Sequence, residues 1–263
     1  EIGTHLIQGF YGELIVLGEI RDNSQWASEK ILVLRLNANG TIINSKEISG
    51  ISSGNPLACS ARGFEIVRLL GSTGPDGFAI CGFTQSCVQG GAQNPIVVRL
   101  DNSLNQVWFK QYNNLHGKFF SIMQRSGGLG TNLITVGTDW DQVGVMAEID
   151  YVSGALVTNN TSIPGTGGNF FYIQGVNHCS KVINTPDGGF LVGSSMLPSR
   201  FGPSKTFMLH KFSASGAPSW GSRYTVGNIN SDVQLEDIKF AGSFYHVLFS
   251  SYDGLILSSI EMG

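Results

Sequence analysis

Residues 186–195, PDGGFLVGSS, begin the most regular stretch of the chain. A loop follows, and then come the apolar run 206–212 (TFMLHKF), the polar segment 213–216 (SASG) and residues 220–224 (WGSRY). Asp, Ser and Gly favour hairpin turns, because they tolerate positive φ or bond to their own backbone. Short apolar runs between such turns are typical of strands. The stretch therefore predicts turn, strand, loop, strand, turn, strand.

The same series recurs four more times in weaker form. The second strand of each copy ends in a small residue, and the copies are residues 12–18 (GELIVLG), 76–82 (DGFAICG), 132–137 (NLITVG), 188–193 (GGFLVG) and 243–250 (SFYHVLFS). The end glycines Gly18, Gly82, Gly137 and Gly193 are 64, 55 and 56 residues apart. That spacing fits one four-stranded sheet with its loops.

The third strand also repeats, as an apolar run with a polar or charged residue near its end. Its copies are residues 31–36 (ILVLRL), 96–100 (IVVRL), 145–149 (VMAEI), 207–212 (FMLHKF) and 255–260 (LILSSI). Such runs suit strands that are covered on both faces. Fourth strands are expected at residues 42–46, 107–112, 155–158 and 220–224, and first strands at 5–10, 63–70, 118–124, 179–183 and 235–240.

Units of four strands that return at this period predict an all-β fold of the β-propeller type, with five blades of about four antiparallel strands. A β-sandwich is the main rival, since it also has many short strands, but it does not require one motif at a fixed period. We expect a single domain over residues 1–263, with approximate blades at residues 5–50, 63–114, 118–164, 178–227 and 233–263.

The fourth unit resembles a repeat of secreted and surface-exposed β-propeller proteins of Bacteroidetes-type bacteria and protists. In that repeat, D-G-G-aromatic-x-x-x-G precedes an apolar strand that ends in K-x-[DS]-x-x-G-x-x-x-W. The match runs from Asp187 to Trp220; the second unit matches partly, through Asp76 and Trp108, and the other three match only in period. The resemblance implies a non-enzymatic surface or interaction propeller whose motif residues are structural. It implies no particular ligand.

The composition limits the partners. Charged residues make up 13 % of the 263 residues, the formal net charge is −3, and no basic tract occurs. We therefore expect no nucleic-acid partner. No apolar run approaches the roughly 20 residues of a membrane helix, so membrane insertion is not expected. The low Lys content and the many Ser, Thr and Asn residues favour an extracellular or cell-surface location, with which sequons at Asn39, Asn159 and Asn160 agree.

The four cysteines are Cys59, Cys81, Cys87 and Cys179. No CxxC spacing occurs, so we expect no zinc site, and no other metal or cofactor is indicated. A local disulfide between Cys81 and Cys87 is one interpretation, in an oxidising compartment. Buried free thiols within apolar strands are the other.

No catalytic signature such as GxSxG, HExxH or a P-loop is present, and the five histidines are scattered. A glycoside hydrolase would need two facing carboxyl groups near the propeller axis, which the innermost strands line. The acidic residues of those strands are Glu65, Glu236 and Asp237, and none lies in a recognisable family motif. We therefore expect no catalytic residues and no enzyme.

An aromatic loop is the candidate ligand site. The third unit carries Asp139, Trp140 and Asp141, and the matching loop of the first unit carries Trp26. Sugar sites use such residues, because apolar sugar faces stack on indole while polar groups hold the hydroxyls. The alternative is a surface loop whose Trp covers a neighbouring blade.

The fifth unit stops after its third strand, so the last blade is expected to lack its outer strand. An unpaired apolar edge invites pairing with another chain. We expect Leu255, Leu257, Ser259 and Glu261 to bind a protein partner or a further part of the same polypeptide. The predicted function is a non-catalytic extracellular or cell-surface module for protein–protein interaction or assembly. The alternatives are a lectin-like propeller that binds a glycan and a glycoside hydrolase.

Overall fold

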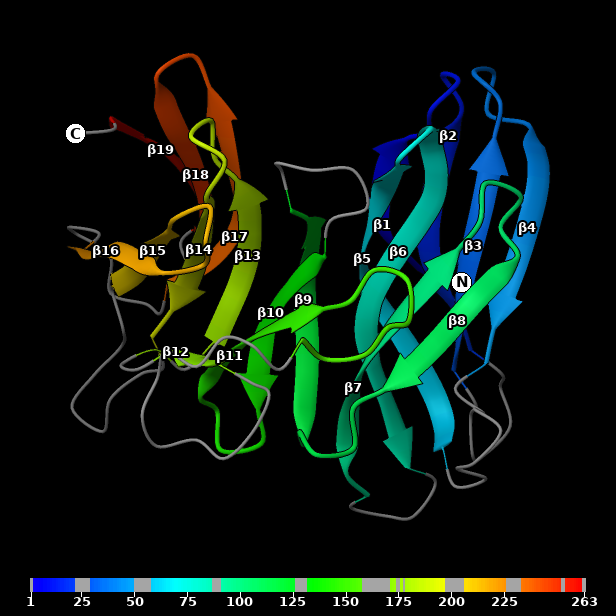
Figure 1. The fold of residues 1–263 in the computed structure, drawn as a ribbon, viewed down its shortest axis with the longest axis horizontal. Helices are drawn as coiled ribbons and strands as arrows, with labels where there is room; N and C mark the ends of the chain where they lie inside the picture. Colours follow the sequence, from blue (N-terminus) through cyan, green and yellow to red (C-terminus); the bar gives the residue numbers. More distant parts are fainter. Residues whose placement is uncertain are drawn as a thin grey trace. The chain divides into compact units, whose positions relative to one another are not determined.

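The computed structural model describes residues 2–21, 29–49, 58–86, 91–125, 132–157, 171–173, 176, 178–196, 206–225, 233–251 and 254–261. Every regular element in these ranges is a β-strand (Figure 1). The predicted all-β fold is therefore confirmed. No helix in the described ranges has the length and apolarity of a membrane span.

The strands form five small antiparallel sheets in chain order (Figure 1). The first sheet contains β1 (Ile2–Gln8), β2 (Leu14–Ile20), β3 (Lys30–Leu36) and β4 (Ile42–Ile48). The second contains β5 (Ala58–Gly71), β6 (Gly74–Ser86), β7 (Gln93–Leu100) and β8 (Gln106–Gln111). The third contains β9 (Gly117–Gln124), β10 (Leu133–Asp139), β11 (Gly144–Ile149) and β12 (Phe171–Ile173). The fourth contains β13 (His178–Asn184), β14 (Phe190–Ser195), β15 (Thr206–Phe212) and β16 (Pro218–Thr225). The fifth contains β17 (Gln234–Ala241), β18 (Phe244–Ser251) and β19 (Gly254–Glu261).

The chain divides into two compact units, Glu1–Gln124 with Asp150–Ala155, and Arg125–Ile149 with Leu156–Gly263. Each unit has a core of its own. In the first, β2, β3, β6 and β7 supply most of the buried aliphatic side chains, and Phe78 lies among them. In the second, strands of the fourth and fifth sheets bury Leu209, Tyr245 and Phe249. The expectation that all five sheets form one domain stays a prediction.

The second and third strands of the middle sheets are largely buried on both faces, as their continuous apolar runs predicted, whereas β18 in the fifth sheet alternates buried and partly exposed residues. In β14 all six residues are buried, and in β6 the eight residues from Gly77 to Thr84 are buried. The fourth strands differ, because β4 and β16 are exposed along most of their length. Burial therefore falls from the middle of each of these sheets towards its last strand.

The first strands carry a shared irregularity that the sequence did not reveal. The pairing register shifts in β1, β5, β13 and β17, between residues 3 and 5, 63 and 65, 179 and 181, and 235 and 237. A β-bulge of this kind re-aims the side chains next to it. The residues that follow the shifts are all ionisable: His5, Glu65, Lys181 and Asp237.

The predicted outer strand of the third sheet was wrong. Residues 155–158 were expected to form it, but Leu156 makes only an isolated bridge to Ile149. The turn at Asp150–Ala155 returns the chain to the end of β11 for that single bridge. The rest of the β11 edge pairs with β12, whose register joins Phe171 to Met146 and Ile173 to Gly144.

Candidate functional site

A buried lysine explains the motif of the fourth sheet. Lys211 Nζ donates to both carboxylate oxygens of Asp187 at 2.8 Å, to Thr185 Oγ1 at 2.8 Å and to the Phe212 carbonyl at 3.1 Å. The Lys211 side chain is 7 % exposed, whereas that of Asp187 is 64 % exposed. Hydrogen bonds from Lys211 and Thr185 lower the pKa of Asp187 to about 2. A Cβ on Gly189 would lie 2.5 Å from Lys211 Nζ and 2.2 Å from the Phe212 carbonyl, so only glycine fits there.

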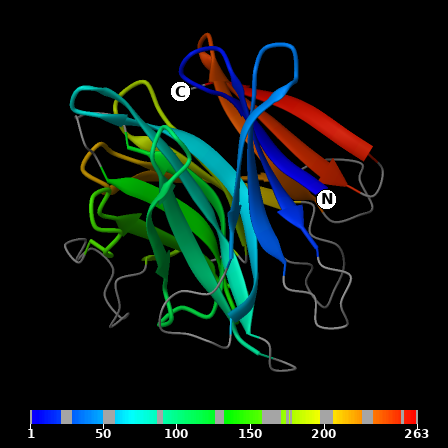
Figure 2. The same ribbon diagram turned by 90° about the vertical axis from the view of Figure 1, so that its right-hand side faces the viewer.

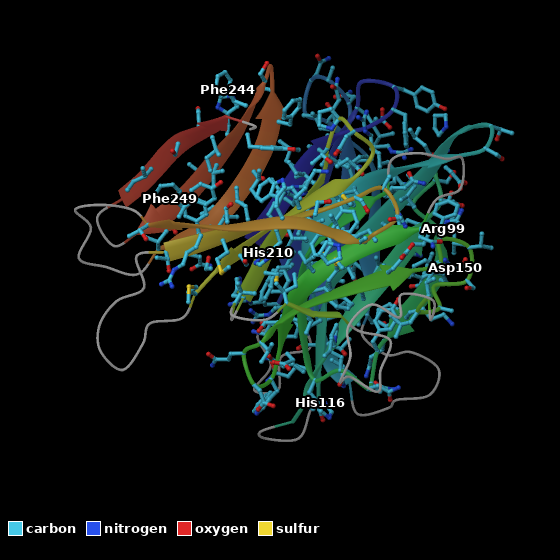
Figure 3. The ribbon with its side chains drawn as sticks, turned by 60° about the vertical axis from the view of Figure 1, so that its left-hand side comes forward. Arg99, His116, Asp150, His210, Phe244 and Phe249 are labelled. Atoms are coloured by element: carbon cyan, nitrogen blue, oxygen red, sulfur yellow. The ribbon has the colours of Figure 1, made fainter. Side chains whose placement is uncertain are left out.

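The same pairing recurs in other sheets. In the second sheet Arg99 Nη2 donates to Asp76 Oδ2 at 2.7 Å, and the Arg99 guanidinium lies 4.2 Å from the Tyr151 ring centroid (Figure 3). In the third sheet the charges are reversed, because Glu148 accepts from Arg125 Nη1 at 3.0 Å. The motif's Asp and its basic residue are thus two halves of one clamp. It joins the turn before the second strand to the penultimate residue of the third, which agrees with a structural role for the motif.

Among the described residues the fifth sheet has no such ion pair. Counted from the bulge in the first strand, Ser259 pairs with His246 as Lys211 pairs with Leu191, so Ser259 takes the position of Lys211. The Ser259 hydroxyl is hydrogen-bonded to His246 Nδ1 at 2.9 Å. Among the described residues β19 is the last strand of its sheet, paired with β18 from Phe244–Glu261 to Ser251–Gly254 (Figure 2). This three-stranded sheet agrees with the expected absence of an outer strand.

The edge of β19 is unlike the edges of the other sheets. Natural edge strands carry Lys or Pro, or are short, which discourages pairing with other chains. Here β4 has Lys46, β8 has Lys110, β16 has Pro218, and β12 spans three residues. In contrast, β19 has eight residues and no Lys, Arg or Pro.

The predicted partner-binding residues all lie on β19. Ser259 is exposed, while Ile256 and Ile260 are half-buried against the core of the second unit. For Leu255, Leu257 and Glu261 the structure describes the backbone alone, and their roles stay predictions.

The candidate ligand loop forms the turn between β10 and β11. Asp139 Oδ1 accepts from the Val143 amide at 2.7 Å, and the Asp139 amide donates to the Val143 carbonyl at 3.0 Å. Trp140 is 62 % exposed at the tip. Burial raises the pKa of Asp139, and the neighbouring Asp141 raises it further. Trp26 lies outside the described residues, so its role as a ligand-binding residue in the matching loop of the first unit stays a prediction.

The acidic residues considered for catalysis are engaged in side-chain contacts. Glu65 is buried, and its Oε2 accepts from Ser121 Oγ at 2.5 Å and from the Ile122 amide at 2.8 Å. His5 Nε2 lies 3.8 Å from Glu65 Oε1. These contacts join the first strands β1, β5 and β9, and no sequence pattern indicated the Ser121 and His5 partners.

In the second unit, Asp237 Oδ1 lies 3.2 Å from Lys181 Nζ, and the exposed Glu236 accepts a hydrogen bond from Ser250 Oγ. Each of these carboxylates therefore has a positively charged or hydroxyl neighbour from another strand.

For the cysteines, both a Cys81–Cys87 disulfide and buried free thiols remain open interpretations. Cys81 is buried in β6, but Cys87 lies outside the described residues, so a disulfide between them stays a prediction. Cys179 is fully buried, and burial raises the pKa of its thiol. No group of three or more His, Cys, Asp or Glu in the described ranges could hold a metal ion.

Neither a family model nor a curated protein matches the chain. Two solved structures are among those similar to the chain. A protein of unknown function from Bacteroides caccae has 12 % identity and a TM-score of 0.45, and the match covers 87 % of this chain and 70 % of that chain. BBS1N, crystallised in complex with ARL6DN and soaked with lead, has 9 % identity and a TM-score of 0.40, with coverage of 97 % and 80 %. At these values neither likeness assigns a family or a function.

Proposed function

We propose that this chain is a five-bladed β-propeller of an extracellular or cell-surface protein, and that it acts as a non-catalytic module for protein–protein interaction or assembly. Five consecutive sheets of the same strand order support this architecture, as does the clamp at matching positions of the second, third and fourth sheets. The low share of charged residues, 13 %, and the many Ser, Thr and Asn residues support the location.

The edge of β19 is the observation that carries the proposed interaction. An edge strand of eight residues without Lys, Arg or Pro presents a row of backbone donors and acceptors to any extended segment. The chain's own fourth strands show what kind of segment fits. Two of them, β8 (QVWFKQ) and β16 (PSWGSRYT), mix polar and aromatic residues, and Tyr224 of β16 stacks on Phe207 of the third strand with centroids 5.2 Å apart. The occupant is therefore an antiparallel strand of mixed polar and aromatic character, from a protein partner or from the same polypeptide.

Site-specific photocrosslinking tests this. A photoreactive phenylalanine analogue at position 259 is expected to form an adduct with an extended segment of the native surface partner, which peptide mapping identifies. The same analogue at the exposed Ser215, in the turn after β15, serves as the control. Adducts at both positions, or at neither, would contradict the proposal. Ser259→Lys places a positive charge on the edge and is expected to weaken capture without unfolding the chain.

Carbohydrate binding at the β10–β11 turn is a second candidate, because Trp140 is 62 % exposed between two carboxylates. A glycan array would identify the sugar, and Trp140→Ala should abolish binding. Trp220→Ala, which removes a 41 % exposed indole from β16, is the matched control. Equal loss in both variants, or no glycan bound, would reject this site.

Catalysis is tested separately. A panel of polysaccharides should show no hydrolysis by the wild-type chain. Hydrolysis that disappears in Glu65→Gln or Asp237→Asn would overturn the non-catalytic assignment and favour a glycoside hydrolase.

A further inference from the structure

Two cations and two aromatic rings share one face of the first unit. Arg62 and Phe64 stand at the β5 bulge, and both lie against Phe83 of β6. Lys118 and Phe120 lie two residues apart on β9 and point to one side of that strand. The Phe64 and Phe120 rings are 5.0 Å apart between centroids. All four side chains are half-buried. We call these four residues the Lys118 face.

A buried ring lies beneath this face. Phe83 of β6 is 3 % exposed and stacks on Phe64 with centroids 5.6 Å apart. Lys118 Nζ lies 4.8 Å from the Phe83 centroid, and the Arg62 guanidinium carbon lies 5.9 Å from it. One ring therefore brings two cations close together.

The two cations are not equally neutralised. Arg62 forms a two-pronged ion pair with Glu29, through Nε to Oε2 and Nη2 to Oε1. Lys118 makes no ion pair with any described residue, and its ammonium group lies over the Phe83 ring. Burial lowers the pKa of Lys118, and the positive charge of Arg62 lowers it further. A half-buried ammonium group beside a second cation is unfavourable until an anion joins it.

We propose that the Lys118 face binds an acidic saccharide, with the sugar's anionic group beside Lys118 and Arg62 and its apolar face against Phe64 and Phe120. The cations supply charge-assisted hydrogen bonds. Phe64 and Phe120, whose planes are tilted by 43°, each offer an apolar ring face against which a sugar ring can pack. This site is separate in sequence from the β19 edge and the β10–β11 turn, and it does not depend on either.

Calorimetric titration of the whole chain tests the site with three probes. Trigalacturonate carries carboxylates, a heparin-derived disaccharide carries sulfates, and maltotriose is neutral. At least one acidic probe is expected to bind with saturation, and its affinity should fall as salt rises, because the contact is ionic. Maltotriose is expected to bind at least about tenfold more weakly. Binding by trigalacturonate alone would define a uronate site, and binding by the disaccharide alone a sulfate site.

Variants locate the binding. Lys118→Gln is expected to lower the affinity for the acidic probe by about tenfold or more. Lys118→Arg keeps the positive charge and should keep this affinity. Lys110→Gln removes an exposed lysine from β8 in the same unit and should change nothing. Phe120→Leu should weaken binding while keeping the fold, as circular dichroism would verify. If no acidic probe saturates at about 10 mM, or if Lys118→Gln and Lys110→Gln bind as the wild type does, the site does not exist.

Discussion

The fourth and fifth sheets, both in the second unit, show what a complete sheet has and an open one lacks. The fourth ends in the outer strand β16, and its third strand holds Lys211 under the Asp187 carboxylate. The fifth ends at β19, and at the position of Lys211 it has Ser259, bonded to His246. The fourth sheet is therefore closed by its own chain and clamped by an ion pair. Among the described strands, the fifth sheet has an unpaired edge at β19 and a polar contact in place of the ion pair, and we propose that a partner strand completes this edge.

The largest expected difference lies between a buried and an exposed phenylalanine near the start of the second strand. Phe190 in β14 is 1 % exposed and stacks on Phe212 with centroids 4.8 Å apart, whereas Phe244 in β18 is 40 % exposed (Figure 3). Phe190→Ala should lower the free energy of unfolding by about 3–5 kcal/mol, because it leaves a cavity. Phe244→Ala should cost less than about 1 kcal/mol. Chemical denaturation measures both, and equal losses would contradict the contrast in packing.

The clamp should give the next largest effect. Lys211→Met keeps the apolar stem and removes the ammonium group, and the exposed Asp187 can then be hydrated, so the expected loss is about 1–2 kcal/mol. Ser259→Ala at the matching position of the fifth sheet should cost about 0.5 kcal/mol or less. Denaturant midpoints compare the two variants. A larger loss of unfolding free energy for Ser259→Ala than for Lys211→Met would contradict the conclusion that the ion pair stabilises the fourth sheet more than the polar contact stabilises the fifth.

Acid should weaken the clamp. The pKa of Asp187 is lowered to about 2 in the folded chain, below its ordinary value of about 3.9. A lowered carboxyl pKa stabilises the fold above the unfolded-state value, and the stability is lost as the pH falls towards 2. Thermal unfolding of wild type and Asp187→Asn should therefore differ at pH 6 and converge near pH 2. If the two proteins differ in unfolding temperature by the same amount from pH 6 to pH 2, the charge of the Asp187 carboxylate does not stabilise the fold.

Strand positions were the part of the fold that the sequence predicted best. Residues 96–100 lie inside β7 and residues 63–70 inside β5, because apolar runs between turn residues leave little choice of structure. The outer strand β12 was not predicted, since its three residues give no periodic signal. The segment that was expected to form this strand makes only the isolated bridge at Leu156. The bulges were also missed, because a register shift depends on the partner strand rather than on local sequence.

The clamp could have been found from the sequence. A basic residue stands one before the end of the third strand in four of the five units if Glu148 is counted as its charge-reversed equivalent. Asp76 and Asp187 stand just before the second strand, where their residue type alone predicts only a turn. The Lys118 face could not have been found in this way, since it joins β5, β6 and β9, whose side chains meet only after folding.

Hydrogen exchange at single residues tests the open edge of β19 most directly. In the isolated chain, the amides of β15 should be protected throughout, because β14 and β16 pair with it on both sides. In β19, which pairs with β18 alone among the described strands, alternate amides should exchange rapidly and become protected when the partner strand binds. Protection of every β19 amide in the isolated chain, at the level of β15, would show that the edge is already covered and would contradict the account.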